Sequence, residues 1–134
     1  GSPATIIENH GSIVYGAVWK IENTDLDELD RQEGVECGIY KPLNVTVKTK
    51  IDGVEEEIPV RTYQLVDNPP APISPNERPL ARQPSKTYLN VMLNGAEETG
   101  LPTDYINFMK SFKHNGQLAS NMELVEKLHL KELL

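Results

Sequence analysis

Cysteines, aromatic residues and long hydrophobic runs are scarce in this sequence of 134 residues. Cys37 is the only cysteine, so an internal disulfide is excluded and a reducing compartment, the cytoplasm, is expected. The neighbouring carboxylate of Glu36 disfavours a thiolate, so we interpret Cys37 as a surface or structural residue rather than a nucleophile. No apolar run approaches the roughly 20 residues that a membrane-spanning helix needs, and no secretory leader is recognisable.

Positive charge is also in short supply, because 13 Lys and Arg stand against 20 Asp and Glu, for a net charge of −7. Nucleic acids and anionic membranes are bound through clustered positive charge, so this balance argues against both as partners. His10, His114 and His129 lie far apart without ligand spacing, and we expect no metal site. The sequence contains no phosphate-binding, dinucleotide-binding or nucleophile-elbow motif.

The strongest strand pattern covers residues 12–21. Successive side chains of a strand point to opposite faces, and here both faces carry apolar residues. This pattern predicts a central strand that is covered on two sides. A short helix should follow, because Thr24 and Asp27 approximate a capping box and Gly34 is a natural residue to end it.

A β-hairpin is predicted next. Residues 45–51 alternate between apolar and polar side chains, and 56–66 form the return strand. Asp52 and Gly53 between them are typical of a two-residue hairpin turn. Pro59 disfavours a central position in a sheet for the return strand.

Proline is concentrated in residues 67–84, which we interpret as a long loop that is either functional or a passive connector. Helices are predicted over 85–100, from Pro102 onward, and over 120–134. The last one is amphipathic and packs either on its own domain or on a second copy, as a homodimer. The element order predicts a single α+β domain over 1–134, with a mixed or antiparallel sheet that could close into a barrel.

Glu33 is the anomalous residue of the first predicted helix. Leu26, Leu29 and Glu33 are spaced i, i+3 and i+7, so the two leucines should carry Glu33 toward the core. Burial and the negative end of the helix dipole both favour the protonated carboxyl, which suits a general acid–base catalyst. The alternative is a frayed last turn with Glu33 in water, and helical spacing alone slightly favours that alternative. The acids Glu22, Glu28 and Asp30 fall off the apolar stripe and predict a solvated face.

Several segments together resemble the animal type of γ-glutamylcyclotransferase. The Gln-Glu-Gly segment followed by Gly-x-Tyr, at this distance from the Tyr-Gly-x-Val-Trp segment, is fairly specific. The resemblance covers nearly the whole chain, with the final helix least certain. The matching segments are Val14-Tyr15-Gly16-Ala17-Val18-Trp19-Lys20, Leu29-Asp30-Arg31-Gln32-Glu33-Gly34-Val35, Gly38-Ile39-Tyr40, Arg61-Thr62-Tyr63, Pro84-Ser85-Lys86-Thr87-Tyr88 and Gly95-Ala96-Glu97-Glu98-Thr99-Gly100-Leu101-Pro102-Thr103-Asp104-Tyr105.

The resemblance implies a mixed-sheet barrel flanked by helices. It also implies a reaction in glutathione metabolism that cyclises the γ-glutamyl part of a γ-glutamyl amino acid to 5-oxoproline and releases the amino acid, without cofactor or metal. The catalytic glutamate of the family falls on Glu33, which the helix spacing had already singled out. A substrate-contacting tyrosine falls on Tyr88, for which the alternative is core packing, and the tyrosine of Gly-x-Tyr falls on Tyr40.

One family feature has no match in this sequence. Family members have an N-terminal strand and a Tyr-Gly-Ser-Asn loop whose backbone grips the γ-glutamyl group, and this sequence contains no such motif. We therefore expect a chain that is incomplete at its N-terminus, with the missing strand and loop supplied by a longer protein. The alternative is a non-catalytic interaction module on the same fold.

Overall fold

The computed structural model describes residues 3–118. These residues fall into two compact units, which are described one at a time. The hairpin unit consists of Ala4–Ile13 and Ala17–Pro72. The helical unit contains the described residues of Gly1–Pro3, Val14–Gly16 and Ile73–Leu134.

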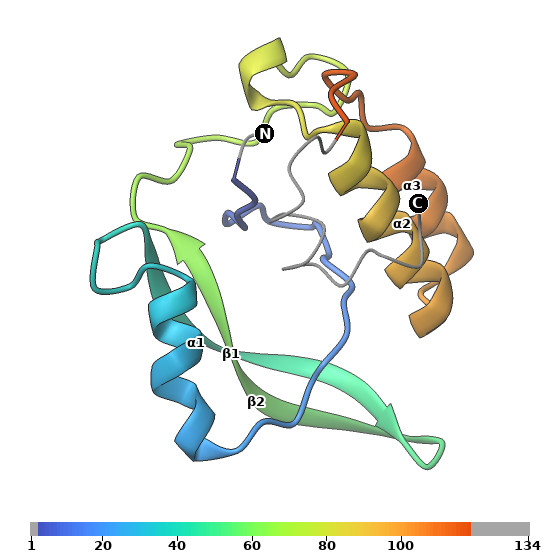
Figure 1. Cartoon of the computed structure of the whole chain (residues 1–134). Coiled ribbons are helices and arrows are strands. Elements are labelled where there is room, and N and C mark those ends of the chain that lie inside the picture. The colour runs from blue at the N-terminus through green and yellow to red at the C-terminus, as the bar shows by residue number, and fades with distance from the viewer. Residues whose placement is uncertain (1–2, 119–134) are drawn as a thin grey trace. The chain divides into compact units, whose positions relative to one another are not determined.

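The hairpin unit contains a 3-10 turn, η1 (Asn23–Asp25), a short helix, α1 (Leu26–Gln32), and two strands, β1 (Tyr40–Ile51) and β2 (Val54–Leu65). The strands pair antiparallel along their whole length, and Figure 1 shows α1 beside this long twisted hairpin. The connecting residues Asp52 and Gly53 have φ angles of 50° and 80°, as a type I′ turn requires. The predicted hairpin and its turn are therefore confirmed.

The register of the hairpin explains how it accommodates proline. Counting outward from the pair Ile51↔Val54, Pro59 lies opposite Thr46 at a position whose backbone N–H would point away from the partner strand. Pro59 therefore costs no hydrogen bond in the ladder, and Pro42, opposite Tyr63, is placed in the same way.

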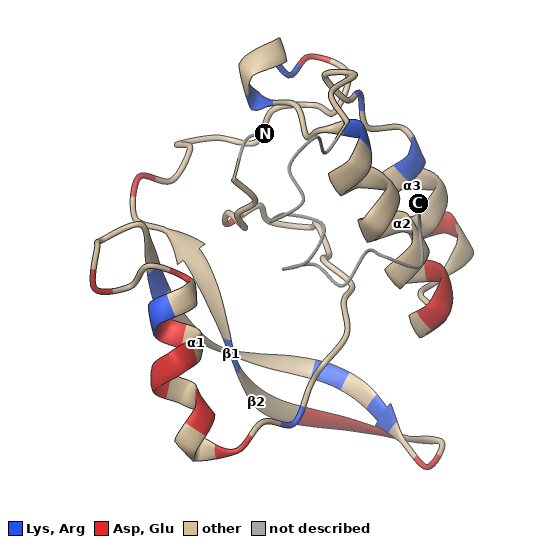
Figure 2. Ribbon diagram, viewed as in Figure 1, with Lys and Arg blue, Asp and Glu red and all other residues tan. Residues whose placement is uncertain are grey.

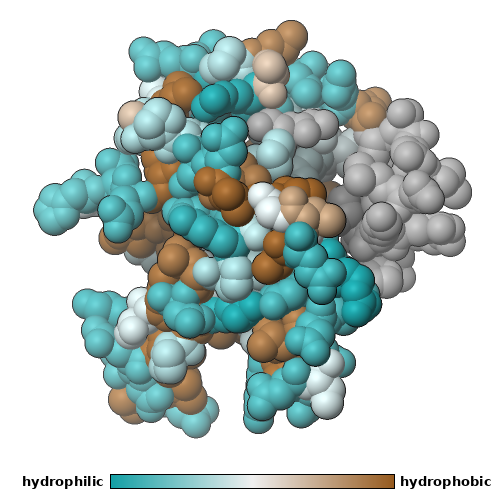
Figure 3. All heavy atoms as spheres, turned by 90° about the vertical axis from the view of Figure 1, so that its left-hand side faces the viewer, coloured by the Kyte–Doolittle hydropathy of each residue, from teal (hydrophilic) through white to brown (hydrophobic). Residues whose placement is uncertain are grey.

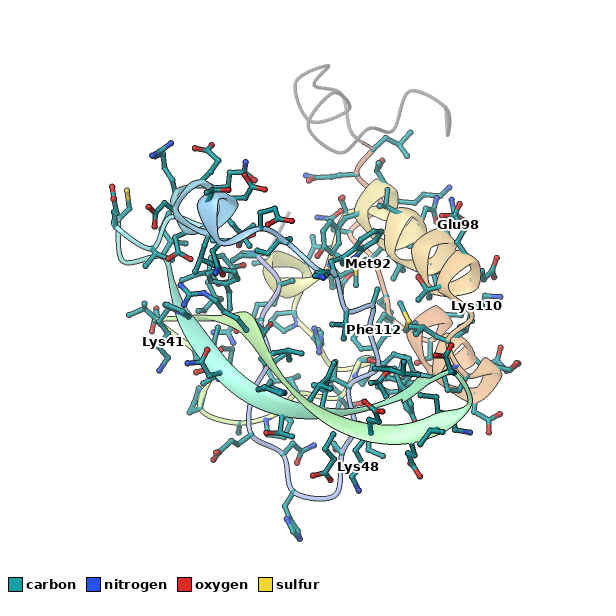
Figure 4. The ribbon with its side chains drawn as sticks, turned by 90° about the horizontal axis from the view of Figure 1, so that it is seen from below. Lys41, Lys48, Met92, Glu98, Lys110 and Phe112 are labelled. Carbon is teal, nitrogen blue, oxygen red and sulfur yellow. The ribbon has the colours of Figure 1, made fainter. Side chains whose placement is uncertain are left out.

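The two faces of the hairpin differ in burial. Leu43, Val45 and Val47 on β1 are half-buried, whereas the residues between them are exposed. Among the exposed residues, Lys48 projects outward from the strand in Figure 4 and lies opposite Glu57 in the ladder. The period-two pattern predicted for residues 45–51 is confirmed as far as Lys50, whereas Ile51, next to the turn, is exposed.

The predicted barrel is not found in the part of the chain that the structure describes. β1 and β2 pair only with one another in a two-stranded sheet, so the α+β class holds while the mixed, closed sheet does not. Residues 12–21, predicted as a central strand, form no ladder with any described segment. Alternating apolar residues can cover two faces, but a strand also needs a neighbour for its backbone groups, and no described strand supplies one here.

For helix α1, the predicted N-terminal cap is not found, whereas the predicted C-terminal end is. The capping box at Thr24 is wrong, because Thr24 lies within η1 and the N-cap residue Asp25 makes no side-chain cap. The end is as predicted. Gly34 has a φ of 68°, and the N–H groups of Gly34 and Val35 donate to the carbonyls of Arg31 and Asp30, each at 3.0 Å. These two bonds form a Schellman motif.

The helical unit contains η2 (Leu80–Arg82), α2 (Lys86–Thr99) and α3 (Thr103–Lys110), which confirm the two predicted helices. The Ser85 hydroxyl oxygen caps α2 by accepting a hydrogen bond from the Tyr88 N–H at 3.1 Å. Residues 67–84 form a loop apart from η2, as predicted. The helix predicted over 120–134 lies outside the described residues.

The most deeply buried side chains of the described residues come from α2 and α3. Ala96, Ile106 and Met109 form the core of the helical unit, with Leu93, Leu101 and Tyr105 packed against them. Lys110 of α3 lies next to α2 in Figure 4, and its ammonium group contacts Glu97 at 3.2 Å.

Many hydrophobic side chains of the described residues stay at the surface, as the brown areas of Figure 3 show. None of the described helices combines the length and hydropathy needed to cross a membrane.

Replacing Gly34 by alanine should destabilise the protein. A Cβ at this position would lie 2.9 Å from Cδ1 of Ile39, and the left-handed backbone costs a non-glycine residue about 1–2 kcal/mol. Denaturant unfolding monitored by circular dichroism should show a loss of at least about 1 kcal/mol. Gly95→Ala is the matched control, because a Cβ there meets no atom within 4 Å and should stabilise α2 by about 0.5–1 kcal/mol. Equal effects of both substitutions would contradict the assigned turn.

Candidate active site

Glu33 is the C-cap residue of α1, directly before the left-handed Gly34. Its N–H donates to the Leu29 carbonyl at 3.0 Å, so its backbone still belongs to the last helical turn. The half-buried side chains of this helical face are Leu26, Leu29, Asp30 and Glu33. The prediction that the leucines carry Glu33 inward is therefore supported, and the alternative of a fully solvated last turn is not.

The segment after Glu33 folds back tightly onto the hairpin. The Gly34 carbonyl accepts hydrogen bonds from the N–H groups of Cys37 and Ile39, both at 3.1 Å. The Ile39 carbonyl in turn accepts from the N–H of Val66 at 3.0 Å, just beyond the end of β2. This turn, residues 33–39, therefore connects Glu33 to the start of β1 through fixed backbone contacts.

Asp30 takes part in the best-connected side-chain cluster of the hairpin unit. One guanidinium nitrogen of Arg61 donates to both carboxylate oxygens of Asp30, at 2.7 and 2.6 Å. The Tyr63 hydroxyl donates to the same carboxylate, and the Arg61 guanidinium lies 5.7 Å from the centre of the Tyr63 ring. The interpretation of Asp30 as a solvated surface acid is therefore wrong, because β2 presents two donors to it. Glu28 is exposed as predicted and pairs with Arg31.

The cluster changes the proton affinities of its members. The hydrogen bond from Tyr63 and the ion pair with Arg61 lower the pKa of Asp30 below its ordinary value of 3.8. Burial, reinforced by the nearby Asp30 carboxylate, raises the pKa of Tyr63 above 10.0. Asp30 is thus held as an anion and is a poor proton acceptor. Figure 2 shows further acidic residues along α1.

The two predicted substrate-contacting tyrosines lie in different units. Tyr40, at the start of β1, belongs with Glu33 to the hairpin unit, and its hydroxyl donates to the Ala4 carbonyl at 2.6 Å. Tyr88 is half-buried in the first turn of α2, in the helical unit. The structure therefore joins Glu33 to Tyr40 through one short segment, and the role of Tyr88 stays a prediction.

The sequence predicts that the single cysteine is not a nucleophile and that the three histidines are not metal ligands. Cys37 is exposed with a free thiol, as expected of a surface cysteine. His10 is exposed, and Nδ1 of His114 accepts the Gly116 N–H at 3.1 Å. His129 lies outside the described residues. Over residues 3–118, no three His, Cys, Asp or Glu side chains are grouped so that they could hold a metal ion.

The sequence profile of the AIG2-like family matches residues 13–109, and the chain belongs to this family. It is homologous to γ-glutamylcyclotransferases, which confirms the resemblance. The protein of that name from Bos taurus is 37% identical over 126 residues, and the one from Homo sapiens is 34% identical over 126 residues. Both alignments cover 94% of this chain and 60% of the relative, so the chain spans about three fifths of their length.

Two solved structures have the same fold over most of this chain. One is a γ-glutamyl cyclotransferase, with 30% identity and a TM-score of 0.73 over 94% of this chain and 67% of that one. The other is an uncharacterized protein from Homo sapiens, with 32% identity and a TM-score of 0.74 over 95% and 67%. These likenesses support an α+β fold of the cyclotransferase type.

The Asp30 cluster predicts how stability depends on pH. Because the pKa of folded Asp30 lies below 3.8, its stabilisation is complete above about pH 4 and is lost as the pH falls through the folded pKa. Neutral Tyr63 contributes up to about pH 10, and this contribution is lost as the pH rises through its raised pKa.

Unfolding free energies measured from pH 2.5 to 11 by denaturant titration test this. Asp30→Asn should flatten the acid limb of the curve and Tyr63→Phe the alkaline limb. Glu28→Gln removes a charge from the same helix and should change neither limb, because its ion pair is exposed. An acid limb in Asp30→Asn as steep as in the wild type would exclude the assigned role of Asp30.

Proposed function

We propose that this protein is a γ-glutamylcyclotransferase, with Glu33 as its general acid–base catalyst. The observation that carries the proposal is a half-buried glutamate, Glu33, at the C-cap of α1, within the region matched by the family profile. Similarity to proteins named γ-glutamylcyclotransferase supports the reaction class. The substrates are γ-glutamyl amino acids, and the products are 5-oxoproline and a free amino acid.

In the proposed mechanism, Glu33 first accepts a proton from the α-ammonium group of the substrate, which is not nucleophilic while charged. The freed amine attacks the γ-carbonyl carbon of the same molecule and closes a five-membered ring. Because the attack is intramolecular, much of the entropic barrier is already removed. The carbon–nitrogen bond to the departing amino acid then breaks as protonated Glu33 returns its proton to that nitrogen. The ring nitrogen, which carries two hydrogens after the attack, gives up its second proton to the regenerated Glu33 carboxylate, and the released amine takes that proton as it leaves. Backbone N–H groups stabilise the oxyanion formed between these steps.

The tyrosines have different parts in this proposal. Tyr88 holds the substrate through its hydroxyl or its ring. Tyr40 lies at the other end of the 33–39 turn from Glu33, and its hydroxyl proton is used by the Ala4 carbonyl. Tyr40 therefore shapes the surroundings of the substrate rather than donating a hydrogen bond to it.

Glu33→Gln should abolish most of the activity, because an amide of the same shape cannot accept the proton. Incubation of the full-length protein with γ-glutamyl-alanine, with 5-oxoproline quantified by chromatography, should show a loss of at least about 100-fold in kcat. Circular dichroism should show an unchanged fold.

The matched control is Glu36→Gln, an exposed glutamate three residues further along the same turn. It should keep wild-type turnover. If Glu33→Gln turns over at the wild-type rate, or if wild type and variant are equally inactive, the assignment of Glu33 as catalyst fails.

A second candidate function is a non-catalytic interaction module on the same fold. It is favoured by exposed apolar side chains of the hairpin unit in the segment that precedes η1, where Trp19 is 82% exposed and Ile13 and Val18 are 66% and 53% exposed. Exposed apolar clusters of this kind are typical of binding surfaces.

The two functions make opposite predictions. An interaction module should show no turnover of γ-glutamyl-alanine at full length, and Trp19→Ser should abolish recovery of a protein partner in a pull-down experiment. An enzyme should turn over the substrate. Met92→Ser, at another exposed apolar residue, is the control and should retain any partner.

A further inference from the structure

We propose that Asp30, Arg61 and Tyr63 form a positioning cluster that fixes the Glu33 carboxylate by holding the end of α1 to β2. This inference rests on the proposed function. None of the three residues is assigned a chemical step, and Asp30 is not an alternative base, because Arg61 and Tyr63 already occupy its carboxylate.

Helix α1 needs such an attachment, because it is short and buries little apolar surface. It has seven residues, and none of its side chains is fully buried. Helices of this length are not stable in isolation, and the half-buried Leu26 and Leu29 supply only limited apolar contact. The position of the helix therefore depends on specific contacts to its neighbour.

The Asp30 cluster has the properties of a strong contact. The Asp30 carboxylate accepts charge-assisted hydrogen bonds from Arg61 and a further one from the Tyr63 hydroxyl. The Arg61 and Asp30 side chains are only 30% and 25% exposed, so solvent screens this pair less. By contrast, the Arg31 and Glu28 side chains on the same helix are 66% and 55% exposed, and such pairs contribute little.

The cluster is linked directly to Glu33 through the backbone. While the Asp30 side chain binds β2, the Asp30 carbonyl accepts the N–H of Val35 at 3.0 Å. That bond closes the Schellman motif around Glu33. The far end of the same turn is bonded to Val66 through the Ile39 carbonyl. The segment that carries Glu33 is thus attached to the hairpin at both ends, and releasing Asp30 frees one of them.

For a proton acceptor, such freedom is costly. Misplacement of a catalytic group by about 1 Å can lower the rate on the order of 100-fold. We expect loss of the cluster to lower kcat much more than it raises KM, because the direction of the Glu33 carboxylate matters most for the proton transfer, whereas other contacts also hold the substrate.

The test compares Asp30→Asn and Tyr63→Phe with Glu28→Gln, which removes one negative charge from the same helix without touching the hairpin. On γ-glutamyl-alanine, at a temperature where all variants are folded, kcat should fall about 30-fold for Asp30→Asn and about 5-fold for Tyr63→Phe. KM should stay within about 2-fold, and Glu28→Gln should match the wild type.

A second arm separates positioning from general destabilisation. In a Glu33→Gln background, Asp30→Asn should cause no further loss, because there is no proton acceptor left to misplace. A merely structural role would lower the residual rate by the same factor in both backgrounds. Hydrogen exchange should also show faster exchange of the Gly34 and Val35 amides in Asp30→Asn, by about 10-fold.

The outcomes distinguish this inference from the proposed function. Unchanged amide exchange overturns the inference whatever the activity. An active wild type, an inactive Glu33→Gln and an unaffected Asp30→Asn overturn the inference and leave the proposed function standing. Equal inactivity of wild type and Glu33→Gln overturns both, even if the exchange rates change.

Discussion

The left-handed turn at Gly34 is the constraint on which the candidate site depends. It ends α1 within one residue of Glu33 and sends the chain back toward β1. Glycine is favoured there, because the backbone is left-handed and a Cβ would lie 2.9 Å from Cδ1 of Ile39. The Glu33 carboxylate thus stands at a helix end whose geometry is set by glycine, by the Schellman hydrogen bonds and by the packing of Ile39.

Local features of the fold could be predicted from the sequence, because each is decided by a few neighbouring residues. The turn at Asp52 and Gly53, the cap at Ser85 and the helix end at Gly34 are examples. The strand over 12–21 could not be settled in this way. Its alternation describes the faces of a strand, but the partner of a strand is a non-local property that the pattern does not contain. The barrel could not be predicted for the same reason, because the closure of a sheet also depends on which strands pair, and the described residues form only a two-stranded sheet.

The candidate site shows the same division. Helical spacing with Leu26 and Leu29 singles out Glu33, but spacing alone slightly favours a side chain in water, and the partial burial of Glu33 is a finding of the structure. The same spacing predicts a solvated Asp30, although residues three positions apart share a helical face and Asp30 stands three residues before Glu33. Its partners Arg61 and Tyr63 are two residues apart on one face of β2, which was the available signal. Without the pairing of α1 with β2, nothing in the sequence connects those donors to Asp30.

The two prolines of the hairpin have a consequence for its outer edges. Pro42 and Pro59 lie on different strands, each at a position where the backbone N–H would face outward. Each edge of the ribbon therefore lacks one donor within its length. A strand from another molecule that added to either edge would leave a carbonyl without a partner at that point, which discourages indefinite sheet growth. The prolines thus protect a long ribbon against self-association at no cost to its internal ladder.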